Sequence, residues 1–124
     1  FGEGPWIDEL DTLEWKRRDL HCVVKRHSQL GYLQGFVGVP ETHPFFGKWH
    51  TDVASLVDVH GGLVYSAGCS HCGIWWFGFD CGHAFDVMPA IAKAVASYKN
   101  LEFVRQGVDM LAVQLLMIER GEMP

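Results

Sequence analysis

A change in hydrophobic period divides this chain into two parts. The last part carries apolar residues at intervals of three or four positions, namely Leu101, Val104, Val108, Leu111, Leu115 and Ile118. Such spacing places apolar side chains along one face of a helix. The first two thirds instead contain short runs rich in β-branched and aromatic residues, which are typical of strands. Strands followed by helices predict an α+β domain in which the helical stripe covers one face of a sheet.

Several runs have the composition of strands. They cover residues 20–26, 32–39 and 74–80, with a shorter run at 13–16 and a run at 57–66 that a glycine pair interrupts. The runs at 20–26 and 32–39, joined by a short polar stretch, predict a hairpin. We expect 60–66 to pair antiparallel with 74–80 across a turn at 67–73. The result is an antiparallel sheet of about four to five strands.

Two C-terminal helices are expected to cover this sheet. The first spans about 89–98 and starts at Pro89, a residue that the first turn of a helix tolerates. The second spans about 101–120, where Met110 and Met117 are expected to fill core space. A chain of 124 residues has room for one hydrophobic core, so we expect a single domain over 1–124.

Composition excludes some classes of protein. Ten Lys and Arg face fifteen Asp and Glu, for a formal net charge of −5. This excess of acid argues against general nucleic-acid binding, which needs clustered basic residues. No apolar run reaches the roughly 18 residues of a membrane helix. The opening residues FGEGP contain neither a basic start nor an apolar segment, so no signal peptide is expected. The oligomeric state stays open.

Three segments carry residues suited to metal binding or acid–base chemistry. They are 58–62 (DVHGG), 69–72 (CSHC) and 80–86 (DCGHAFD). If 60–66 pairs with 74–80, His60 lies at the end of the second strand, close to Asp80 and His83. Asp86 or Asp58 would join them there. Imidazole and carboxylate groups together bind a divalent ion and leave a coordination position for water.

These residues predict a hydrolytic site with a metal-bound water as nucleophile. The expected catalytic residues are His60, Asp80 and His83, and the expected metal ligands are His60, His83 and Asp86, with zinc as the first choice of divalent metal. Acid–base chemistry without metal and a Cys81 nucleophile are the alternatives. In a purely structural interpretation, Asp80 and Asp86 cap the next helix and the two histidines bond to the backbone at a bulge.

The cysteines offer a second metal hypothesis. Cys69 and Cys72, followed by Cys81 and His83, have the residue types of a structural zinc site. A straight strand over 74–80 would hold its two ends roughly 20 Å apart. A shared zinc therefore requires a bend at Gly78. Free thiols or a Cys69–Cys72 disulfide are the other interpretations.

The neighbouring tryptophans must serve different surfaces. Side chains alternate along a strand, so Trp75 and Trp76 point to opposite faces and at least one of them belongs to the core. The other, together with Tyr65 and aromatic residues of the loop at 40–51, is expected to line a pocket under that loop. We expect the pocket residues to be Tyr65, Trp76 and His43. Such a pocket suits a flat ligand such as a nucleobase, or a protein partner.

Several sequence blocks resemble a family of small proteins encoded by tailed bacteriophages. They are 35–40 (GFVGVP) followed by His43 and Pro44, 58–63 (DVHGGL) with Tyr65, and 75–83 (WWFGFDCGH) with Asp86. Among them, HGGL and WWxGFDCxH are the specific motifs. The chain departs from the family at Phe85, where glycine is usual. The resemblance implies a viral protein made in the cytoplasm of the bacterial host, and it supplies no mechanism.

Two functions follow from these observations. The first is a phage accessory protein that acts as a metal-dependent hydrolase on a small or nucleotide-like substrate. The alternative is a non-catalytic phage binding protein that inhibits or sequesters a host component, such as a defence protein.

Overall fold

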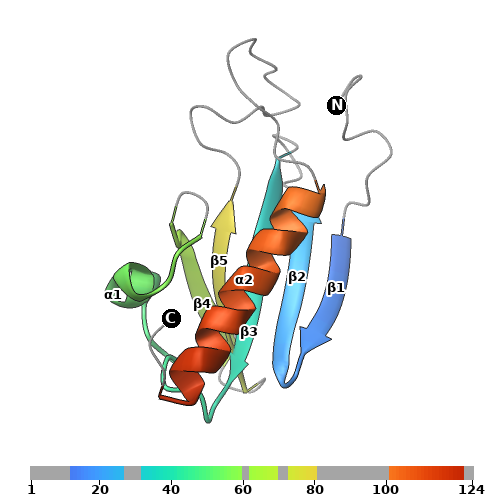
Figure 1. Ribbon diagram of the computed structural model, residues 1–124. Helices are drawn as coiled ribbons and strands as arrows, with labels where there is room; N and C mark the ends of the chain where they lie inside the picture. The colour runs from blue at the N-terminus through green and yellow to red at the C-terminus, as the bar shows by residue number, and fades with distance from the viewer. Residues whose placement is uncertain (1–11, 27–31, 60–61, 70–72, 81–100, 122–124) are drawn as a thin grey trace, which may run out of the picture.

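The computed structural model describes residues 12–26, 32–59, 62–69, 73–80 and 101–121. Within these ranges five strands form one antiparallel sheet in the order β1-β2-β3-β5-β4, and a long helix, α2, lies across one of its faces (Figure 1). The strands are β1 (Thr12–Arg17), β2 (Leu20–Arg26), β3 (Leu33–Pro40), β4 (Tyr65–Cys69) and β5 (Ile74–Asp80). The helices are α1 (His50–Val53), the short 3-10 helix η2 (Ala54–Leu56) and α2 (Leu101–Glu119).

The first three strands follow the sequence pattern closely. The predicted hairpin is confirmed, since β2 and β3 pair antiparallel with Val23 opposite Phe36. The short run at 13–16 is extended by one residue on each side as β1, which pairs with β2 across a tight turn. Arg18 in that turn has a φ of 56°. The α+β class and the antiparallel sheet are therefore confirmed.

The strand predicted over 57–66 is wrong in its extent. Its described residues up to Val64 are not in a strand, and β4 begins only at Tyr65. Gly62 has a φ of 80°, and its N–H donates to the carbonyl of Val59, which closes a turn at the point where a strand was expected. The predicted antiparallel pairing with the tryptophan-rich strand is confirmed for Tyr65 and Ser66, but β4 continues to Cys69, so residues 67–69 are in a strand where a turn was expected.

The core lies between the sheet and α2. The buried side chains of α2 are Val104, Val108, Leu111, Ala112 and Leu115. They belong to one cluster with alternate residues of the central strands, among them Val37, Phe77 and Phe79. A Cβ added to Gly35 on β3 would lie 2.6 Å from Cγ2 of Val108, so this glycine allows the helix to approach the strand closely.

The helix also exposes apolar residues on its outer side. Met110 is 60% exposed, so the prediction that it fills the core is wrong. Its position on α2 lies outside the buried stripe, because residue 110 precedes Leu111 by 100° of helical rotation. The predicted helix over 89–98 lies outside the described residues and stays a prediction. Among the helices that the structure describes, none has the length and apolar character needed to cross a membrane.

Candidate ligand-binding site

The face of the sheet opposite α2 carries a row of partnered residues from all five strands. Strand register places Glu14, Val23, Phe36, Gly78 and Tyr65 in one line across β1, β2, β3, β5 and β4. The next row on the same face contains Lys16, His21, Gly38, Trp76 and Ala67. Because side chains alternate along each strand, residues of these rows point away from the buried core. We call this surface the open face.

Glycines make the aromatic side chains lie flat on the open face. Phe36 and Gly78 are cross-strand partners, and a Cβ on Gly78 would lie only 2.6 Å from Cδ1 of Phe36. Trp76 and Gly38 form the reciprocal pair on the same two strands. A Cβ added to Gly38 would lie 3.1 Å from Cδ2 of Trp76. Each ring thus covers the bare backbone of its partner glycine, and β3 and β5 together present two aromatic platforms.

Two further rings border these platforms at an angle to them. Tyr65 meets Phe36 edge to face with ring centroids 5.4 Å apart. His21 lies beside Trp76 with centroids 6.1 Å apart. The His21 and Trp76 rings are tilted by 52°, whereas the edge-to-face geometry of Tyr65 on Phe36 is a favourable one. Tyr65 is nevertheless 44% exposed, so the platform is accessible to solvent.

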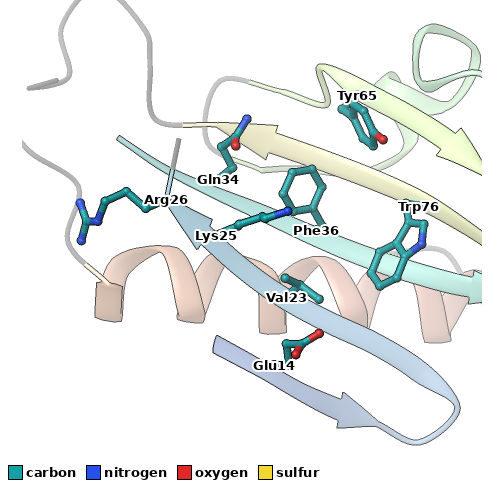
Figure 2. A pocket seen from close by; sticks show the side chains of 8 residues that line it. All are labelled: Glu14, Val23, Lys25, Arg26, Gln34, Phe36, Tyr65 and Trp76. Carbon is teal, nitrogen blue, oxygen red and sulfur yellow. The ribbon is translucent and has the colours of Figure 1, made fainter. Parts of the chain in front are cut away.

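A shallow hollow of about 640 Å³ opens over this surface. It is lined by Glu14, Val23, Lys25, Arg26, Gln34, Phe36, Tyr65 and Trp76. Figure 2 shows the three aromatic rings on neighbouring strands, with Lys25 and Glu14 on the two strands beside them. The volume of the hollow lies within the range of about 300–1,000 Å³ that is common for small-molecule sites.

The rim of the hollow has polar groups without internal partners. In the part of the chain that the structure describes, no hydrogen bond or ion pair engages the side chains of Glu14, Lys25 or Gln34. Arg26 differs, because it is almost buried and interacts elsewhere in the molecule. The Glu14 carboxylate, the Lys25 ammonium and the Gln34 amide lie around the aromatic rings. They are accessible to a ligand that forms hydrogen bonds or ion pairs.

The structure separates His43 from the other two predicted pocket residues. Tyr65 and Trp76 line the same hollow, whereas His43 is only 3% exposed and does not line it. The Nε2 atom of His43 lies 2.8 Å from the carbonyl oxygen of Leu115, and its Nδ1 accepts the N–H of Phe45. Since a carbonyl can only accept, Nε2 carries the proton of this ring.

The hollow also does not lie under the loop that follows β3. That loop packs on the opposite face, where Phe45 is buried against Phe77. Phe46 and Trp49 both contact Trp75, and the indole N–H of Trp75 donates to the carbonyl of Lys48. Trp75 therefore serves the loop, and Trp76 serves the open face.

Among the residues predicted for the catalytic or metal site, the structure describes Asp58, Asp80 and the backbone of Cys69. Asp80 ends β5 as the partner of Gln34, on the same face as Trp76, and it has interactions of its own. Burial, and secondarily the charge of Asp80, raises the pKa of Tyr32. His60, His83, Asp86, Cys72 and Cys81 lie outside the described residues. Within those ranges, no group of three or more His, Cys, Asp or Glu side chains could hold a metal ion.

The segment before His60 is fixed to α2 by a side-chain clamp. The Gln114 amide oxygen accepts the N–H of Asp58 at 2.7 Å, and its amide nitrogen donates to the Asp58 carbonyl at 2.9 Å. On the other side of His60, the N–H of Val64 donates to the carbonyl of Gly78 on β5. The chain on either side of His60 is thus held by α2 and by β5, respectively.

Sequence reasoning missed Phe36, Glu14, Lys25 and Gln34 as residues of this hollow. The signal for Phe36 was the spacing of glycine and aromatic residues in GFVG and WFGF. When the two strands pair, this spacing places each large ring opposite a glycine of the other strand. The place of Glu14 depends on the pairing of β1 with β2, which the sequence left open, whereas Lys25 and Gln34 are partners in the predicted hairpin. Comparison with protein-family models, curated proteins and solved structures finds no match to this chain.

Proposed function

We propose that this chain binds a nucleotide-like small molecule on the open face of its sheet. The observation that carries the proposal is the reciprocal pairing of Phe36 with Gly78 and of Trp76 with Gly38. Rings held flat on the backbone offer their faces for stacking, and stacking of a base on an aromatic ring contributes about 1–3 kcal/mol. The polar ends of Lys25 and Gln34, which have no partner among the described residues, would supply hydrogen bonds at the rim.

Calorimetric titration with nucleoside monophosphates tests this function. We expect saturable binding that weakens about tenfold or more in Phe36→Leu, which removes a platform ring, and in Tyr65→Ala, which removes the ring that stands beside it in the hollow. Trp49→Ala is the matched control, because Trp49 is a 61% exposed ring outside the hollow. Inorganic phosphate alone should not bind. Failure of all nucleotides to bind the wild-type protein would refute the proposal.

Hydrolysis of the bound molecule is the second part of the proposed function. It is supported by the place of Asp80, which is on the face of β5 that carries Trp76 and is paired with the pocket residue Gln34. With His60, His83 and Asp86 as ligands, a divalent metal, zinc first, would supply an activated water. We expect stoichiometric metal in the purified protein and its loss in His60→Ala and His83→Ala. Metal content unchanged by both substitutions would contradict this ligand set.

The biological setting follows from the resemblance alone. We propose a phage accessory protein acting in the cytoplasm of a bacterial host. If no nucleotide binds, the alternative is a non-catalytic phage protein that sequesters a host component on the open face. Co-purification of a defined host protein, lost in Phe36→Leu and Tyr65→Ala but kept in Trp49→Ala, would favour that alternative.

A further inference from the structure

Two charges of opposite sign, Glu14 and Lys25, lie on adjacent strands that line the hollow, and Figure 2 shows Val23 between them. Glu14 is the partner of Val23 on β2, and Lys25 is two residues further along β2, so the two side chains are diagonal neighbours on adjacent strands. Diagonal neighbours lie about 7–8 Å apart at their Cα atoms, within reach of long side chains. Both are exposed, and no ion pair between them is found in the described part of the chain. The pair is therefore available to a ligand that lies on Phe36.

The two groups have complementary hydrogen-bonding capacity. An ionised carboxylate only accepts hydrogen bonds and an ammonium only donates them. A ligand that offers one donor to each carboxylate oxygen and an acceptor to the ammonium must present two adjacent donors beside an acceptor on one edge. Among the bases, guanine carries an amino donor at N2 and acceptors at O6 and N7, and its N1–H lies between N2 and O6. Adenine carries a single amino donor, at N6, beside the acceptor N1.

We propose that the hollow selects a guanine base, with Glu14 accepting from N1–H and the N2 amino group, and with Lys25 donating to O6. This inference rests on the proposed function, since it requires a base stacked on the open face. It assigns specificity to two residues of β1 and β2, whereas stacking comes from β3, β4 and β5. Selectivity and stacking can therefore be separated by substitution.

Titration of three purine monophosphates tests the base preference. Guanosine monophosphate should bind about tenfold or more tightly than adenosine monophosphate, which is the discrimination expected from one two-pronged contact. Inosine monophosphate, which lacks the N2 amino group and keeps N1–H and O6, should fall between them. Equal dissociation constants for all three would overturn the guanine inference and leave the stacking proposal standing. Absence of binding by all three, with binding of a pyrimidine monophosphate, would overturn the guanine inference alone, and absence of binding by all nucleotides would refute both.

A charge-removing variant ties the preference to Glu14. In Glu14→Gln, guanosine monophosphate should bind about tenfold more weakly while adenosine monophosphate changes little, because the carboxylate contact is specific to the guanine edge. Glu119→Gln is the matched control, since Glu119 is an exposed carboxylate at the end of α2 and outside the hollow. Circular dichroism and urea midpoints should match among the three proteins. An unchanged ratio of the two dissociation constants in Glu14→Gln would overturn the assignment.

Discussion

His43 connects the turn after β3 to the C-terminal half of α2. One ring nitrogen accepts the N–H of Phe45, and the other donates to the carbonyl of Leu115. The ring also meets Phe45 edge to face, with centroids 5.5 Å apart. A buried side chain that satisfies two backbone groups from distant segments has a structural role, and the cost of its loss lies in those groups.

Replacement of this ring should lower stability strongly. His43→Ala leaves the Phe45 N–H without its acceptor in a buried site, so we expect the free energy of unfolding to fall by about 2–3 kcal/mol. Urea denaturation measures this change. His43→Asn should lose less, because its side-chain oxygen can replace Nδ1 as acceptor for Phe45. A similar stability of His43→Ala and wild type would show that water satisfies these groups.

At the scale of secondary-structure elements, the approach of α2 to the sheet depends on small residues. Gly35 on β3 lies under Val108, and a Cβ there would also come within 2.7 Å of the Phe79 ring. A methyl group at this position must push the helix or the ring away. The short distance between α2 and the sheet at this point thus requires glycine at position 35.

Gly35→Ala should therefore destabilise the protein by overpacking, by about 1–3 kcal/mol. Thermal or urea unfolding measures the loss. In a Val108→Ala background the added cost of Gly35→Ala should shrink, since the closest clashing atom is gone, and a double-mutant cycle isolates this coupling. Strict additivity of the two substitutions would contradict direct contact between them.

The elements also show what the sequence pattern could reveal. Alternation along 74–80 correctly separated Trp75 from Trp76, because this period depends only on local strand geometry. The helical stripe correctly gave the buried face of α2. The turn closed by Gly62 and Val59 was missed, because a glycine pair is compatible with either a bulge or a turn. The burial of His43 was missed, because its partner Leu115 is 72 residues away.

At the scale of the whole molecule, stability should depend on pH in the alkaline range. Burial of Cys22 against α2 raises the pKa of its thiol to about 11, and the charge of Asp109 adds to this effect. Tyr32 is shifted in the same direction. Between the unfolded pKa of the thiol, near 9.0, and about 11, the unfolded chain binds fewer protons than the folded chain. Stability therefore declines as the pH rises through this window.

Urea unfolding at about pH 8, 9, 10 and 11, values that span the titration of the Cys22 thiol, measures this decline. The free energy of unfolding should be flat with respect to this thiol below pH 9. Above pH 9, the free energy of unfolding should decline less steeply in Cys22→Ala than in the wild type. Parallel declines in the two proteins would show that Cys22 does not contribute to the alkaline loss.

The order of strands has a kinetic consequence. β1, β2 and β3 form a meander of neighbours in sequence, and β4 and β5 form a second local hairpin. Among the described strands, only the β3–β5 pairing joins segments that are distant in sequence. Local hairpins close quickly, whereas pairing across a long connection carries a larger entropic cost and forms slowly. We therefore expect the pairing of Phe36 with Gly78 and of Trp76 with Gly38 to form late in folding. Substitutions in the β3–β5 pairing should therefore change the observed refolding rate. Substitutions within either hairpin turn should act mainly on the earlier and faster closure of that hairpin.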